Sequence, residues 1–159
     1  MNKYITGILI LAALLAAALF FAPESKKATQ KSEVASVVIA EPSSYDFGDI
    51  DIFGGKVTIA YALKNTGAED VTILSGVTSC ACTEGEIDDL RFGMHESSGA
   101  TVIIPAGGEK ILKATFDPLA HGPEGVGAAK RELLLKTNST ETPQIKIVFT
   151  VNVIKQGSQ

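Results

Sequence analysis

"QIKIVFTVNVI", residues 144–154, is the segment that decides the fold class of this chain. Apolar side chains stand at every second position, and most of the positions between them are polar. Successive side chains of an extended strand point to opposite faces, so this pattern places an apolar row against a core and a polar row in solvent. The apolar row consists of Ile145, Ile147, Phe149, Val151 and Val153. The segment therefore predicts a half-buried β-strand.

Segments of the same kind precede it, separated by turn residues. "KVTIAYALKN" at residues 56–65 alternates in the same way and lies between the turn signals Gly54-Gly55 and Asn65-Thr66-Gly67. Further short β-branched segments lie at residues 37–40, 45–50, 70–77, 100–104, 108–117 and 130–137. After the N-terminal apolar run, no segment has helical periodicity. We expect residues 36–159 to form an all-β sandwich or barrel of about seven or eight strands with one core.

The N-terminus carries an apolar run, "ITGILILAALLAAALFFA", at residues 5–22. As a helix it would be about 27 Å long, close to the roughly 30 Å thickness of the hydrocarbon core of a bilayer. A cleaved signal peptide is the alternative, but the run is longer than an ordinary signal core, and Phe20 and Pro23 fit a cleavage site after Ala22 poorly. We expect residues 1–23 to be an uncleaved transmembrane signal anchor.

Residues 24–35 are polar and lack aromatic side chains, so we expect a solvated tether between the anchor and the domain. Three lysines follow the apolar run and only Lys3 precedes it, so the charge rule does not favour a cytoplasmic N-terminus. The side of the membrane that the domain occupies therefore depends on the resemblance described below.

Charge and motifs exclude some classes of function. The chain has 159 residues, which suits one domain, with 14 Lys and Arg against 18 Asp and Glu and a net charge of −4. A surface that binds nucleic acid needs an excess of positive charge, so we expect no nucleic-acid partner. The sequence contains no Gly-x-Ser-x-Gly or His-Glu-x-x-His motif and gives no positive reason to propose an enzyme.

The two cysteines of the chain stand one residue apart in "TSCACT", residues 78–83. On one extended strand, the Cα atoms of Cys80 and Cys82 would be about 6.6 Å apart. A disulfide prefers roughly 5.5 to 6 Å, so a bridge requires a bend in the backbone. Four interpretations stay open: small buried residues, a disulfide, a metal site and a thiol-exchange pair.

The metal interpretation needs further ligands. Two thiolates with Met94 or His95 would suit Cu(I), and with His95 and His121 they would suit Zn(II). His121 lies in the Gly- and Pro-rich segment "LAHGPEGVG", which predicts an exposed loop. Nothing in the sequence shows that the two histidines converge on the cysteines.

Four segments in order resemble one bacterial domain-of-unknown-function family: "YDFGDI" from Tyr45, "VTIAYALKNTG" from Val57, "VTILSGVTSCACT" from Val71 and "IPAGGEKILKATFDP" from Ile104. Members share an aromatic-Asp-Phe-Gly opening, a Lys-Asn-Thr-Gly turn, a Ser-Cys-Gly-Cys-Thr segment and a Phe-Asp-Pro ending. The closing "KTNSTETPQIKIVFTVNV" is similar to the final hairpin of that family. The resemblance covers residues 45–153.

The resemblance implies an immunoglobulin-like β-sandwich, related to Hydin-type and major-sperm-protein-like domains, with no established activity. Such proteins are usually exported and often anchored to a membrane, so we place the domain on the extracytoplasmic side, in the periplasm or at the cell surface. The motif positions to which the resemblance gives a structural role are Phe47, Gly48, Asn65, Gly67, Phe116, Asp117 and Pro118.

Two departures from the family pattern are visible. Ala81 replaces the usual glycine between the cysteines, so a positive φ is not expected there. Residues 83–105 are longer than the family suggests and begin with several acidic residues, so we expect a long loop. Loops on a rigid scaffold commonly carry binding sites.

These observations lead to two hypotheses about function. The first is a membrane-anchored, extracytoplasmic protein-interaction module without a cofactor, which binds another envelope protein through a sheet edge or through residues 83–105. The alternative is an envelope protein that handles copper or zinc with Cys80 and Cys82.

Overall fold

The computed structural model describes residues 33–95, 97 and 101–156, and in these residues all regular elements are β-strands. In chain order they are β1 (Val38–Glu41), β2 (Ser44–Asp51), β3 (Val57–Asn65), β4 (Val71–Thr78), β5 (Thr83–Ile87), β6 (Leu90–Phe92), β7 (Val102–Ile104), β8 (Glu109–Phe116), β9 (Gly127–Thr137) and β10 (Gln144–Ile154). The predicted anchor at residues 1–23 and the tether up to residue 32 lie outside the described residues. Among the described residues, no helix is long and apolar enough to cross a membrane.

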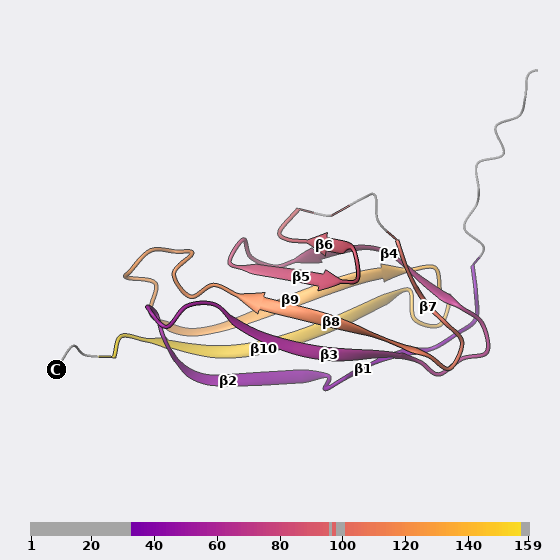
Figure 1. Cartoon of the computed structure of the whole chain (residues 1–159), viewed down its shortest axis with the longest axis horizontal. Coiled ribbons are helices and arrows are strands. Elements are labelled where there is room, and N and C mark those ends of the chain that lie inside the picture. The colour runs from indigo at the N-terminus through magenta and orange to yellow at the C-terminus, as the bar shows by residue number, and fades with distance from the viewer. Residues whose placement is uncertain (1–32, 96, 98–100, 157–159) are drawn as a thin grey trace, which may run out of the picture. The chain divides into compact units, whose positions relative to one another are not determined.

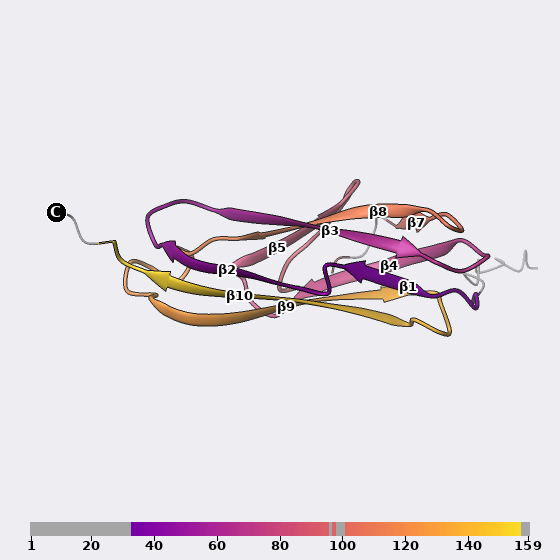
Figure 2. The same cartoon turned by 90° about the horizontal axis from the view of Figure 1, so that it is seen from below.

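The ten strands form two five-stranded sheets that pack face to face (Figure 1). The first sheet has the order β1-β3-β8-β5-β6, and the second has the order β2-β10-β9-β4-β7. Figure 2 shows the two layers from the side, with β3 and β8 in one layer and β10 and β9 in the other. The chain passes from the first sheet to the second between β1 and β2, and β2 runs parallel to β10. The all-β expectation for this part of the chain is confirmed.

The core follows the alternation of the sequence. On β10 the five predicted inward residues are at most 4% exposed, and Ile145 and Ile147 pair with Leu135 and Leu133 of β9. The ring of Phe149 lies 5.8 Å from that of Phe116 on the facing sheet and 5.5 Å from that of Phe47 on β2. These aromatic contacts join the two sheets near the middle of the core.

Asn65 and Gly67 shape the turn that follows β3. The buried Asn65 side chain donates to the carbonyls of Glu69 and Ile104, at 2.8 and 3.1 Å, and its oxygen accepts from the amide of Gly67 at 3.0 Å. A side chain at Gly67 would collide with Ser36, since an added Cβ would lie 2.7 Å from its Cα atom. The turn therefore requires a glycine at this position.

The expectation of a long loop at residues 83–105 is wrong for its first part, which contains β5 and β6, whereas β7 is the strand segment predicted at residues 100–104. On β5, Gly85 and Ile87 face the core while Glu84 and Glu86 point outward. Because the outward positions of β5 are acidic, its alternation of buried and exposed residues was interpreted as a charged loop in the sequence. The described part of the sandwich consequently has ten strands, more than the seven or eight expected.

Phe92 on β6 packs into space that two glycines leave free. An added Cβ at Gly76, on the facing sheet, would lie 2.6 Å from the Phe92 ring, and one at Gly85 would overlap the same ring. We expect Gly76→Ala to lower the free energy of unfolding by about 1 to 3 kcal/mol, because overpacking strains the core. Gly93→Ala is the matched control, since its added Cβ meets no atom within 4 Å. Equal denaturation midpoints for both variants would contradict this packing.

Candidate functional site

The two cysteines lie in the turn between β4 and β5, and backbone hydrogen bonds hold this turn from two sides. The Ser79 amide donates to the Glu132 carbonyl at 2.9 Å, and the Glu132 amide donates to the Ser79 hydroxyl at 3.0 Å. The Asp117 amide donates to the Cys82 carbonyl at 2.9 Å. The turn is thereby fixed to β9 of one sheet and to the end of β8 of the other.

The bend that a disulfide requires is formed inside the turn. The Thr83 amide donates to the Cys80 carbonyl at 3.1 Å, and the Thr78 hydroxyl lies 3.0 Å from the carbonyls of both residues. The Cα atoms of Cys80 and Cys82 are 5.2 Å apart, and their sulfurs form a disulfide. Ala81 is not among the described residues with positive φ.

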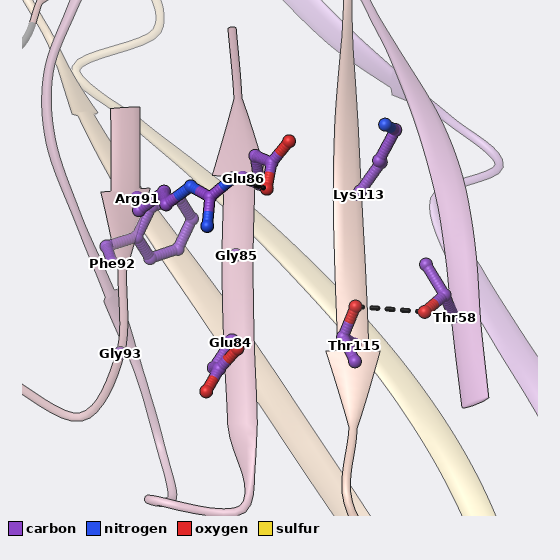
Figure 3. A pocket seen from close by; sticks show the side chains of 9 residues that line it. All are labelled: Thr58, Glu84, Gly85, Glu86, Arg91, Phe92, Gly93, Lys113 and Thr115. Atoms are coloured by element: carbon purple, nitrogen blue, oxygen red, sulfur yellow. Dashed lines mark hydrogen bonds and ion pairs between the residues drawn. The ribbon is translucent and has the colours of Figure 1, made fainter. Parts of the chain in front are cut away.

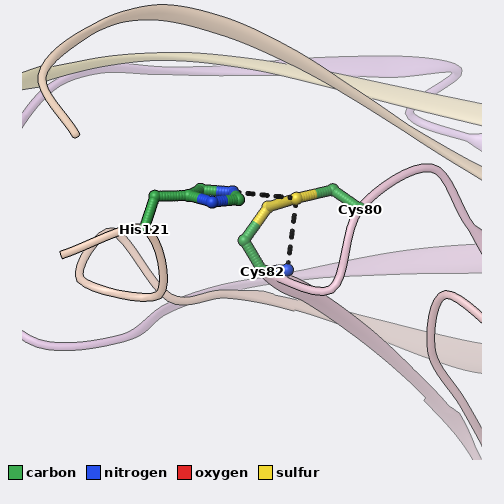
Figure 4. Close-up of side chains that lie close together, drawn as sticks. All are labelled: Cys80, Cys82 and His121. Atoms are coloured by element: carbon green, nitrogen blue, oxygen red, sulfur yellow. Dashed lines mark hydrogen bonds between the residues drawn. A yellow bond between two sulfur atoms is a disulfide. The ribbon is translucent and has the colours of Figure 1, made fainter.

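The two sulfurs have different surroundings. Cys80 is half-buried, and its sulfur lies 3.2 Å from Nε2 of the exposed His121, which follows β8 (Figure 4). Cys82 is only 2% exposed, and Nε of Arg131 donates to its sulfur at 3.0 Å. The disulfide therefore has one accessible sulfur beside an imidazole and one buried sulfur beside a guanidinium.

Arg131 occupies an inward position of β9, directly opposite Phe149 of β10. Its guanidinium lies 5.7 Å from the centroid of the Phe116 ring, and Nη1 donates to the carbonyl of Lys130 at 2.9 Å. Both contacts restrict the side chain, and the aromatic ring attracts the cation. The guanidinium is thus held where it meets the sulfur of Cys82.

In the described part of the chain, no carboxylate forms an ion pair with Arg131. The neighbouring Glu132 pairs instead with Lys146 at 2.9 Å and Lys130 at 3.4 Å on the outer face of the sheet. These two lysines, Lys146 above all, hold the pKa of Glu132 below its ordinary value. Glu132 therefore does not neutralise the positive charge that Arg131 places beside Cys82.

The candidate metal ligands fall into two groups. Sγ of Cys80, Sγ of Cys82 and a ring nitrogen of His121 lie within 4.8 Å of one another. Met94 and His95 are exposed in the segment after β6, and His95 does not belong to this group. The structure thus places His121 beside the cysteines. The sequence suggested His121 as a ligand only together with His95.

Arg131 is a functional candidate that sequence analysis missed. In "GAAKRELLLKT" its position falls in the same alternating row as Leu133 and Leu135, which are buried. A charged residue in an inward row was the available signal, because such a group is costly to bury without a partner. Its proximity to Cys82, 49 residues earlier, depends on the pairing of the sheets.

A hollow of about 560 Å³ lies on the outer face of the first sheet (Figure 3). Its polar groups largely pair with one another: Arg91 contacts Glu86 at 3.1 Å, and the Thr58 and Thr115 hydroxyls are 2.9 Å apart. A much smaller cavity of about 40 Å³ borders Cys82, with Ala81 and Asp117 in its wall. The disulfide and its two neighbours therefore form the stronger candidate site.

Comparison with known proteins places this chain in a family. A family model described as "Protein of unknown function (DUF1573)" matches residues 38–153, more than half of the chain, and no curated protein matches. A protein of unknown function from Porphyromonas gingivalis W83 is 17% identical with a TM-score of 0.59, over 80% of this chain and 51% of that chain. This chain thus spans about half the length of that protein.

Two further solved structures are similar at lower scores. PapD-like domain 7 of human CEP192 is 15% identical with a TM-score of 0.47, over 76% of this chain and 87% of that chain. SSP-19, an MSP-domain protein like family member in Caenorhabditis elegans, is 13% identical with a TM-score of 0.45, over 71% of this chain and 97% of that chain. At these identities a likeness concerns the fold alone.

The buried hydroxyl of Thr78 offers a test of how the cysteine turn is held. We expect Thr78→Val to lower the free energy of unfolding by about 1 to 3 kcal/mol, because a buried hydrogen-bond donor to the turn carbonyls is lost. Thr58→Val removes an exposed hydroxyl from β3 and serves as the control. Chemical denaturation of both variants measures the difference. A loss for Thr58→Val as large as that for Thr78→Val would contradict the assignment.

Proposed function

The chain belongs to the DUF1573 family of proteins of unknown function, as its motifs led us to expect, and we propose that it is an immunoglobulin-like protein-interaction module. In this proposal, residues 1–23 anchor the protein in the membrane, and the sandwich faces the extracytoplasmic side, where it binds another envelope protein and catalyses no hydrolysis. The charge-free apolar run at residues 5–22 supports the anchor.

The exposed edge strand β2 is the observation that carries the interaction proposal. It has eight residues, whereas the other three edge strands, β1, β6 and β7, have four, three and three. Among the described strands, β2 pairs only with β10, so its outer side can offer backbone donors and acceptors to an added strand. Strand addition of this kind supplies affinity through main-chain hydrogen bonds and specificity through alternate side chains.

The charge of β2 indicates which partner would fit. Asp46, Asp49 and Asp51 lie along this strand, and like charges on a second copy would repel it. Asp46 accepts hydrogen bonds from the amide of Gly48 and the hydroxyl of Thr150, and these two bonds hold its pKa below the ordinary value. The acid therefore stays ionised at neutral pH. We infer that the partner strand carries Lys or Arg.

Photocrosslinking tests this edge directly. We expect a benzophenone side chain at Tyr45, which is 39% exposed on β2, to form adducts with an envelope protein when the chain is expressed in its own host. The same side chain at Ile111, which is 43% exposed on β8, is the control. Replacing Asp46 and Asp49 with Lys should lower the adduct yield by about tenfold, because charge complementarity is reversed. Equal adducts at both positions, or none at Tyr45, would refute β2 as the docking edge.

The convergence of His121 on the cysteines favours a second candidate function, the handling of a soft metal ion by the reduced protein. Two thiolates and an imidazole suit Cu(I), and the resulting anionic dithiolate complex is compatible with the guanidinium of Arg131. Here His121 replaces the Met94 and His95 that the sequence offered as ligands.

Anaerobic titration with Cu(I) against a competing chelator tests this candidate. We expect His121→Ala to weaken binding by about tenfold or more, because a direct ligand is lost. The double variant Met94→Leu, His95→Ala should bind as the parent does. The reverse order of effects, or unchanged binding after both cysteines are replaced with serine, would exclude this site.

A further inference from the structure

The asymmetry of the disulfide has a chemical meaning. An incoming thiolate must reach one of the two sulfurs, and the sulfur that it does not attack must leave with the electron pair. Cys80 is half-buried whereas Cys82 is 2% exposed, so access favours attack on Cys80. The electron pair then passes to Cys82, the sulfur that receives the hydrogen bond of Arg131.

We propose that Cys80 and Cys82 form a thiol–disulfide exchange centre that oxidises a dithiol of another protein, with Cys80 as the attacked sulfur and Arg131 stabilising Cys82 as the leaving thiolate. This activity goes beyond the interaction module and does not depend on it. Each sulfur leaves in one step of the exchange, and each has its own stabilising neighbour.

In the first step, a thiolate of the substrate attacks Sγ of Cys80. A bond forms between these two sulfurs, the Cys80–Cys82 bond breaks, and Cys82 leaves as a thiolate. Nε of Arg131 already lies 3.0 Å from this sulfur, so little rearrangement is needed as the negative charge develops. Phe116 and the carbonyl of Lys130 hold the guanidinium in place.

In the second step, the other thiolate of the substrate attacks the substrate sulfur in the mixed disulfide. The bond to Cys80 breaks, and Cys80 leaves with the electron pair beside the imidazole of His121, whose Nε2 lies 3.2 Å from its sulfur. The substrate gains a disulfide and loses two electrons. The protein gains the two electrons. Cys80 takes up one of the two protons that the substrate thiols released and becomes a thiol, Cys82 remains a thiolate, and the other proton goes to solvent.

The direction of exchange follows from the charges. A cation beside Cys82 stabilises the reduced, thiolate form more than the neutral disulfide. A disulfide whose reduced form is stabilised is the stronger oxidant. The centre therefore accepts electrons from dithiols, and exchange with a second disulfide restores its oxidised form.

The rate of reduction by glutathione tests the role of Arg131 in the full chain, in metal-free buffer with a chelator. We expect Arg131→Met to slow the reaction by about tenfold, because the leaving thiolate loses an opposite charge, and Arg131→Lys to recover part of the rate. Lys113→Met removes a charge from the outer face of the first sheet and should react as the parent does. An unchanged rate for Arg131→Met would overturn the proposal.

Two measurements on the parent keep the test independent of how the variants fold. Mass spectrometry of the acid-quenched reaction should find glutathione on Cys80, and a synthetic peptide with two cysteines should become oxidised in proportion to the protein added. Glutathione attached mainly to Cys82, or a peptide that stays reduced, would refute the exchange centre.

Discussion

The contact between Phe149 and Phe116 joins the two sheets, and the rest of the site depends on it. Phe149 lies on β10 opposite Arg131 of β9, and Phe116 ends β8 on the facing sheet. Because the two rings lie 5.8 Å apart, the guanidinium of Arg131 can stack over Phe116 and still reach Cys82. The amide of Asp117, directly after Phe116, holds the Cys82 carbonyl. Core packing and site geometry therefore share the same residues.

Arg131 breaks the pattern of its strand. The other inward residues of this part of β9, Leu133 and Leu135, are fully buried and apolar, as a sandwich core requires. A partly buried cation without a carboxylate costs free energy that a leucine at the same position would not. A residue that breaks the pattern of its strand at a cost in stability is expected at a functional site. The disulfide beside the guanidinium gives the departure a chemical role.

The edge strand and the disulfide are connected through the register of the second sheet. Tyr45 of β2 is the partner of Phe149, which in turn is the partner of Arg131. A polypeptide added along β2 would thus lie at the level of Arg131, separated from it by three strand spacings, about 14 Å. Docking at the edge and chemistry at the disulfide can therefore act on one bound protein, although neither requires the other.

The all-β class, the inward rows of β3 and β10 and the need for a bend between the cysteines could be predicted from the sequence, because alternation and covalent geometry are local properties. The sequence did not predict β5 or β6, and on β5 the charged residues Glu84 and Glu86 made the strand alternation hard to recognise. The contacts of His121 and Arg131 with the two sulfurs could not be predicted from the sequence, because they depend on how the chain folds. These residues lie 41 and 49 positions away from their cysteines, and proximity over such separations is decided by strand pairing and by the packing of one sheet on the other.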